Sequence, residues 1–304
     1  MGELRERMRR DLKLRGFSDS TIDQYTHHVK QFFLEAQIND PESVTVETIL
    51  QYQFELLEKK KFAAQTVNVR IAALRFLFLT TLGKKWDPKA FPFVKKPRRI
   101  PVILSLDEVA RLIMAIDNLS HRTMMLAIYG GGLRAREAVH LKAEDIHSDR
   151  LLMHVQFGKG GKNRYTLLPV VLLEALRHYW RTTPTVDKSH WLFPSTVDPK
   201  KPIDTSTIRT AFRTALKKSG INRKVTLHSL RHCFATHLLE SGVDIRYIQV
   251  LLGHVRLSTT LIYSIVRECQ FKELTGPLGA VGKKLTWIPS QPSIAPAKKG
   301  EDAA

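Results

Sequence analysis

The chain has 304 residues, 43% of them hydrophobic, which is enough to bury the core of one large domain or of two ordinary ones. Its 48 Lys and Arg residues outnumber its 29 Asp and Glu residues, and the formal charge of +19 favours a polyanionic partner, with nucleic acid first. The sequence has no apolar run of about 18 residues, no N-terminal secretory segment and no CxxC motif at its two cysteines, which argues against a membrane span, a signal peptide, a disulfide framework and a zinc knuckle.

Residues 1–94 form the first predicted unit, which is all-helical. Apolar residues recur at helical spacing in residues 18–37, 45–60 and 63–83, behind good N-cap residues such as Thr45. This periodicity fits a DNA clamp and a plain helical bundle equally well. Because the unit is basic, its charge favours the clamp.

A basic, proline-rich linker is predicted at residues 95–104, because proline ends helices and extends the residue before it. Four cations in this stretch are placed to lie along a phosphate backbone, although a solvated linker would have the same composition. We expect phosphate contact. The four cations are Lys95, Lys96, Arg98 and Arg99.

Residues 105–275 are predicted to form a second unit that is mainly α with a small antiparallel β-sheet. Ser105 and Glu108 fit a capping box, Gly130 to Gly132 separate two helical stretches, and apolar alternation on both sides of a Gly- and Lys-rich turn predicts a β-hairpin. Five helices are predicted after the hairpin, at residues 171–180, 205–220, 226–242, 244–253 and 258–274. We expect a flexible tail at residues 276–304, where Pro, Gly and Ala replace periodicity.

Arg134 directly follows the three glycines and opens a helix that carries Glu137 one turn later. Free backbone N–H groups and the helix dipole favour negative charge at a helix N-terminus, so the guanidinium of Arg134 is placed to meet an anion. Surface helices also carry many Arg–Glu pairs at i, i+3. On these two residues alone, a surface ion pair is the better interpretation.

The segment GKGGKNR is predicted to be the tip of the hairpin. It is not a nucleotide-binding P-loop, because that motif requires a glycine at the position of Gln156 and a hydroxyl at the position of Asn163. What remains is a set of three cations that either reach a phosphate or stay in water. They are Lys159, Lys162 and Arg164.

The segment TLHSLRHCFATH places His228 and Arg231 at i, i+3, so both donors lie on one helical face. A metal site is not indicated, because a second ligand cluster at zinc spacing is missing. We therefore expect no metal and no cofactor, and histidines in such a segment are usually core or capping residues. The possible metal ligands that we reject are His228, His232, Cys233 and His237.

In LLGHVRLSTTLIYSIV, Gly253 ends one predicted helix and leaves His254 in the turn before the next. Tyr263 falls in the early turns of that next helix. Considered alone, Tyr263 is a half-buried aromatic residue whose hydroxyl finds some hydrogen-bond partner.

Taken together, these motifs resemble the tyrosine recombinase (phage integrase) family. GLRAREAVHL, GKGGKNR, LHSLRHCFATHLL and VLLGHVRLSTTLIY are similar to family blocks and stand in the family order, while STIDQY and NVRIAALRFLF are similar to the family's N-terminal domain. The resemblance covers most of the chain. It implies a helical, SAM-like core-binding domain at residues 1–94 and a mixed α/β catalytic domain at residues 105–275.

Carried over position by position, the resemblance implies a nucleophile, two phosphate-binding arginines, a general acid and two histidines that act in acid–base or hydrogen-bonding roles. In that order they are Tyr263, Arg134 with Arg231, Lys159, and His228 with His254. Glu137 is implied to orient the cations. Two guanidiniums on the non-bridging oxygens offset the charge that builds in the transition state, so a metal ion is not required. Lys162 and Arg164 are added to the linker cations as expected DNA contacts.

The family implies an enzyme that cuts and rejoins double-stranded DNA through a 3′-phosphotyrosine, without ATP. It also implies a protein that is a monomer when free and a homotetramer on synapsed DNA sites. Integration or excision of a mobile element is the expected use, and chromosome or plasmid dimer resolution is the alternative. A non-catalytic DNA-binding protein and a type IB topoisomerase are further alternatives. We expect a cytoplasmic, nucleoid-associated protein without membrane contact.

Overall fold

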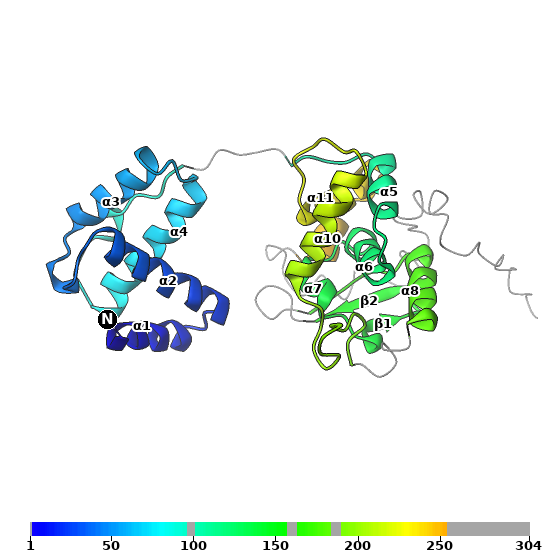
Figure 1. Ribbon diagram of the computed structural model, residues 1–304, viewed down its shortest axis with the longest axis horizontal. Helices are drawn as coiled ribbons and strands as arrows, with labels where there is room; N and C mark the ends of the chain where they lie inside the picture. The colour runs from blue at the N-terminus through cyan, green and yellow to red at the C-terminus, as the bar shows by residue number, and fades with distance from the viewer. Residues whose placement is uncertain (1, 96–100, 157–162, 184–189, 254–304) are drawn as a thin grey trace, which may run out of the picture. The chain divides into compact units, whose positions relative to one another are not determined.

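The computed structural model describes residues 2–95, 101–156, 163–183 and 190–253, and the chain divides into two compact units, residues 1–99 and 100–304 (Figure 1). Each unit has its own hydrophobic core. The secondary structure of these described residues is mainly helical with one small antiparallel sheet, as the sequence predicted. Among the described residues, no helix combines the length and the hydrophobicity that crossing a bilayer requires.

Helices make up most of the described N-terminal unit. They are α1 (Gly2–Leu14), α2 (Asp19–Glu35), α3 (Val46–Glu58) and α4 (Ala64–Arg75), with the π-helical turn η2 (Phe76–Thr81) and the 3₁₀ turns η1 (Pro41–Ser43) and η3 (Pro88–Ala90). The predicted cap at Thr45 is confirmed, since its hydroxyl accepts a 3.2 Å bond from the backbone N–H of Thr48.

Two features of this unit differ from the prediction. Helix α1 agrees with the predicted all-helical unit but had no predicted range, because its sequence is mostly charged and buries only Met8 and Leu12. The helix predicted over residues 63–83 changes to π-helical hydrogen bonding at Phe76. Apolar spacing does not separate these two hydrogen-bond patterns, because both keep the same broad face toward the core.

A polar cluster joins three helices of the N-terminal unit. The guanidinium of Arg70 on α4 donates to Glu35 on α2 (3.0 Å) and to the hydroxyl of Tyr52 on α3 (2.6 Å). Burial raises the pKa of Tyr52 to about 12, so its hydroxyl stays protonated and donates to Glu35 (2.9 Å). These bonds, which are partly or fully buried, fix how the helices pack against each other, because each partner would be costly to leave unpaired.

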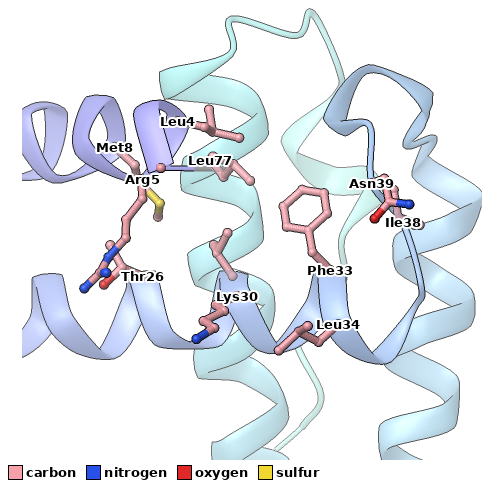
Figure 2. Close-up of a pocket in the computed structure, with 12 residues that line it drawn as sticks. Leu4, Arg5, Met8, Thr26, Lys30, Phe33, Leu34, Ile38, Asn39 and Leu77 are labelled. Carbon is pink, nitrogen blue, oxygen red and sulfur yellow. The ribbon is translucent and has the colours of Figure 1, made fainter.

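The chain after η3 remains bound to this unit as far as Val94. The side chain of Asn68 exchanges two hydrogen bonds with the backbone of Val94, at 2.9 and 2.8 Å, and Gln53 donates to the carbonyl of Pro92. A hydrophobic pocket of about 370 Å³ lies between α1 and α2, with Leu77 behind it (Figure 2). The residues that line it include no carboxylate, histidine or cysteine, and its charged groups are the cations of Arg5 and Lys30.

The C-terminal unit combines a small sheet with several helices (Figure 1). Its described elements are α5 (Leu106–Met114), α6 (Leu119–Gly130), α7 (Ala135–Val139), η4 (Ala143–Asp145), β1 (Ile146–His147), β2 (Leu152–Val155), β3 (Arg164–Leu167), α8 (Val170–Thr182), α10 (Thr205–Lys218), α11 (Leu227–Glu240) and α12 (Ile245–Leu252). The capping box at the start of α5 and the helix end at Gly253 are confirmed. The helix predicted at residues 258–274 and the tail at residues 276–304 lie outside the described residues.

The predicted hairpin is confirmed, with β2 antiparallel to β3 and Val155 opposite Arg164. Strand β1 is an addition, and it pairs with the other edge of β2. Two residues are too few to show an alternating pattern, so the sequence contained no signal for it. The pairing places Arg164 at the first position of β3.

Helix α6 lies in the core, and a buried chain of hydrogen bonds ties it to α11 and to the start of the unit. The Nε2 of His237 lies 3.0 Å from the carbonyl of Leu104, and the Nδ1 lies 2.9 Å from the hydroxyl of Tyr129. Because a carbonyl only accepts, Nε2 carries the proton and Nδ1 accepts from Tyr129. Burial lowers the pKa of His237, so this neutral form is the stable one.

Replacing His237 with Gln tests this arrangement. Below a pH of about 6.5 the unfolded chain binds a proton at His237 that the folded chain resists, so this residue makes the protein less stable as pH falls. We expect the melting temperature of His237→Gln to fall less steeply than that of the wild type between pH 7 and pH 5. His28, His121 and His232, whose pKa values are also lowered, are present in both proteins. Identical slopes would contradict the assignment.

Candidate active site

Glu137 lies at the centre of a cluster of charged side chains in the described part of the C-terminal unit. It lies in the first turn of α7, and its carboxylate accepts a 2.8 Å bond from the backbone N–H of Arg134, which closes the helix start. Its side chain is only 3% exposed. The pair expected at i, i+3 therefore exists, but the carboxylate is buried and is not part of a surface ion pair.

Three guanidiniums surround this carboxylate. Arg134 donates to it at 2.6 Å, Arg164 donates to both oxygens at 2.9 and 2.7 Å, and Arg231 has its Nη1 3.7 Å away. They come from the start of α7, from β3 and from α11. Three positive charges against one negative charge leave the cluster positive, so it attracts an anion.

Burial by itself would raise the pKa of Glu137, but hydrogen bonds and charge from Arg164, with further bonds from Arg134, lower it to about 2. Burial, together with the charges of Arg134 and Arg164, lowers the pKa of Arg231, and a guanidinium still remains protonated near neutral pH. Glu137 is thus an anion that offsets part of this repulsion.

The arginines differ in their access to solvent. The side chain of Arg134 is 27% exposed, whereas those of Arg164 and Arg231 are 7% and 3% exposed. Arg231 also donates to the carbonyls of Gly132 and Leu252, which fixes its guanidinium between the end of α6 and the end of α12. Arg134 is therefore the arginine of the cluster that most readily meets a ligand from solution.

The expectation that Arg164 is an exposed cation of the hairpin is wrong. Its guanidinium is buried and donates to Glu137 and to the carbonyl of Leu251, at the end of α12. The sequence does not indicate this role, because a basic residue beside a lysine-rich turn looks like a surface residue. The one sequence signal for its burial was its place as the first residue of the predicted second strand of the hairpin, which is β3 in the structure.

Helix α11 carries His228 and Arg231 one turn apart, as expected. Arg231 points into the cluster, while His228 is exposed and has its ring centroid 4.8 Å from that of His232. His237 and Cys233 belong to the core, where the thiol accepts from the backbone N–H of Leu104. Within the described ranges, no three His, Cys, Asp or Glu side chains are grouped to hold a metal ion.

Several candidate residues lie outside the described residues. They are Lys159, Lys162, His254, Tyr263 and, in the linker, Lys96, Arg98 and Arg99. Lys95 is described and is exposed. The described part of the site is therefore the arginine cluster with His228.

Gly132 shapes the turn that leads into Arg134. Its φ is +61°, and a Cβ at this position would lie 2.5 Å from Cδ1 of Phe234 on α11. Glycine is needed here for two reasons, because the left-handed conformation disfavours other residues and because the ring of Phe234 leaves no room. This close contact brings the start of α7 against α11, and so Arg134 near Arg231.

Comparisons with known proteins identify the family of this chain. Residues 103–268 match the Phage integrase family, and residues 4–88 match the domain described as Phage integrase, N-terminal SAM-like domain. Tyrosine recombinase XerA of Pyrococcus horikoshii is 36% identical over 86% of this chain and 88% of its own length. A Sinorhizobium fredii protein, y4qK, named as a candidate integrase/recombinase, is 42% identical over 86% of this chain and 84% of its own.

Solved structures show the same fold. A lambda integrase dimer bound to a COC′ core site is similar with a TM-score of 0.67 and 20% identity, over 86% of this chain and 96% of that one. XerH recombinase bound to difH substrate is similar with a TM-score of 0.61 and 20% identity, over 80% of this chain and 76% of that one. At this identity the likeness concerns the fold.

Replacing Gly132 with Ala should destabilise the C-terminal unit more than replacing Gly220, which has a similar φ of +68° but no heavy atom within 4 Å of an added Cβ. Both variants lose about 1 kcal/mol to the left-handed conformation. Gly132→Ala should lose a further 1–3 kcal/mol, roughly, by overpacking against Phe234. Urea unfolding measures the difference, and equal losses would show that the turn has room to spare.

Replacing Glu137 with Gln should cost about 3–5 kcal/mol of unfolding free energy, because it leaves buried guanidiniums without their counter-charge. Glu174→Gln is the matched control, since Glu174 forms an i, i+3 pair with Arg177 at 2.7 Å on the surface of α8. Its loss should be below about 1 kcal/mol. If the two variants unfold at the same urea concentration, the Glu137 carboxylate does not hold the cluster together.

Proposed function

This chain belongs to the phage integrase family of tyrosine recombinases, and from that premise we propose that Tyr263 is its nucleophile and that the cluster around Glu137 binds the scissile phosphate. The protein is an enzyme of site-specific DNA recombination. The observation that carries the proposal is the buried carboxylate with three guanidiniums, which has an excess of positive charge and lies within residues 103–268.

The arginines act on the phosphate, and two other groups move the protons. Guanidiniums of Arg134 and Arg231 bind the non-bridging oxygens and offset the charge that develops on them. Arg134 is accessible to solvent, and the carbonyls of Gly132 and Leu252 accept from only two of the five N–H groups of the Arg231 guanidinium. Glu137 keeps both oriented, and it limits the repulsion between them.

In the cleavage step, the hydroxyl oxygen of Tyr263 forms a bond to phosphorus while the bond to the 5′-oxygen breaks. A phenol in water has a pKa of about 10, so the reaction needs a base. We assign this role to His228, which lies on α11 and is exposed. Lys159 gives a proton to the departing 5′-oxygen, and His254 donates a hydrogen bond to the phosphate. Attack by another 5′-hydroxyl reverses the step and joins new strands.

The two units divide the work of binding DNA. We assign core binding to residues 1–94 and catalysis to residues 105–275, with the linker of residues 95–104 along the phosphate backbone through Lys95, Lys96, Arg98 and Arg99. Lys162 contacts phosphate near the catalytic lysine. The basic charge of the chain supports this assignment, since such contacts are electrostatic and independent of sequence. Arg164 is excluded from these contacts because it is buried.

We also propose that the protein acts as a homotetramer on two synapsed sites, from a free monomer, in the cytoplasm and on the nucleoid. The support for the tetramer is a similar solved structure, a lambda integrase tetramer bound to a Holliday junction, with a TM-score of 0.66.

Integration or excision of a mobile element is the proposed use. The support is the integrase/recombinase name of relatives that are 42% identical. Dimer resolution by the same chemistry is the second candidate.

A trapping experiment tests the nucleophile. The protein is incubated with nicked duplex DNA that carries its recombination site, found by sequencing the DNA that flanks the gene, and the mixture is then denatured. We expect a covalent adduct at the 3′ end of the cut strand that forms in EDTA and is lost in Tyr263→Phe. Tyr165→Phe is the control, because Tyr165 is an exposed tyrosine of the same unit and should still form the adduct.

An adduct that persists in Tyr263→Phe would overturn the assignment of the nucleophile. Relaxation of supercoils without exchange between two sites would instead favour the topoisomerase alternative.

A further inference from the structure

We propose that Arg164 is a positioning residue, which holds the end of α12 against the arginine cluster and so fixes where the chain continues to His254. This inference rests on the proposed function, because His254 and Tyr263 both follow α12 in the sequence. Arg164 does not itself touch DNA. Its effect on catalysis passes through Glu137 and through the last turn of α12.

All three nitrogen atoms of the Arg164 guanidinium have a partner inside the unit. Nη1 and Nη2 donate to the two oxygens of Glu137 at 2.9 and 2.7 Å, and Nε donates to the carbonyl of Leu251 at 2.8 Å. The bidentate pair sets the plane of the guanidinium, and that plane sets the direction of the Nε–H bond. The position of the Leu251 carbonyl is thereby tied to the position of the Glu137 carboxylate.

The end of α12 depends on such contacts. The last carbonyls of a helix have no partner within the helix. Here Arg164 takes the carbonyl of Leu251, and Arg231 takes the carbonyl of Leu252. Both guanidiniums also lie beside Glu137, so one carboxylate aligns the two groups that cap α12. The phosphate-binding arginines and the helix before His254 are thus set relative to each other.

Gly253 shows how closely Arg164 approaches this helix end. Its φ is +64°, and a Cβ at this position would lie 2.8 Å from Cδ of Arg164. The side chain of Arg164 has little freedom to retreat, because its guanidinium is bonded on both sides. Glycine therefore ends the helix and also admits the stem of Arg164.

Lysine cannot replace this arrangement. Its single ammonium can remain near Glu137, but it has no planar fork and cannot reach the carboxylate and the Leu251 carbonyl in fixed directions. Arg164→Lys therefore keeps the charge and removes the geometry. Arg177→Gln is the matched control, because Arg177 also pairs with a glutamate, Glu174, but on the surface of α8.

The experiment measures the rate constant of adduct formation in a single turnover with protein in excess, together with the Kd for the duplex site. We expect Arg164→Lys to lower the rate constant about 10- to 100-fold, since a misplaced reacting group has an effect of that order. The Kd should stay within about twofold of the wild type, because a buried side chain contributes no phosphate contact. Arg177→Gln should match the wild type in both.

Other outcomes would overturn the proposal. A lower amplitude with an unchanged rate constant would mean that Arg164 only keeps more of the protein folded. A raised Kd with a shallower salt dependence would mean that it binds phosphate directly. A rate constant in Arg164→Lys equal to that of the wild type would mean that only the positive charge at this position is needed.

A second measurement does not depend on activity. In the full-length protein without DNA, amide hydrogen exchange at Leu252 and Gly253 should be faster in Arg164→Lys than in the wild type, while exchange in α6 stays the same. Unchanged exchange at the end of α12 would overturn the inference even if Tyr263 is the nucleophile. Absence of a Tyr263 adduct in the wild type would overturn the proposed function and leave this structural result standing.

Discussion

The described part of the site depends on the ion pairs between the carboxylate of Glu137 and the three arginines around it. The carboxylate is withdrawn from water and is flanked by guanidiniums of α7, β3 and α11. A buried carboxylate alone would be protonated, and close guanidiniums alone would repel each other, so each charge is stable only because of the other. The first turn of α7, the first residue of β3 and the inner face of α11 must therefore come together for any of them to be buried.

The same contacts prepare the site for chemistry. The cluster is neutralised enough to be stable inside the unit, but it keeps an excess of positive charge, and Arg134 remains accessible to solvent. Backbone carbonyls of Gly132 and Leu252 orient Arg231 before any ligand arrives. Donors that are oriented in advance do not have to reorganise when charge develops on a phosphate, which is the main advantage of such a site over water.

Much of the fold follows from local patterns. Thr45 and the Ser105–Glu108 box act within one turn, and Gly253 ends α12 because it adopts a left-handed conformation. Each of these signals lies within a few residues of its effect, so the sequence contains it. Helix α1 and strand β1 were missed for the opposite reason, since the first has few apolar residues and the second is too short to alternate.

By itself, the sequence determined the family, the order of the motifs and which residues are candidates for the chemistry, because motifs are patterns of neighbouring residues. Only the tertiary structure decided which charged groups face water. Arg164 has partners 27 and 87 residues away, and Arg231 has one 99 residues away. No local pattern contains such contacts, because they arise when β3, α7 and α12 pack against one core and exclude water from the charges between them.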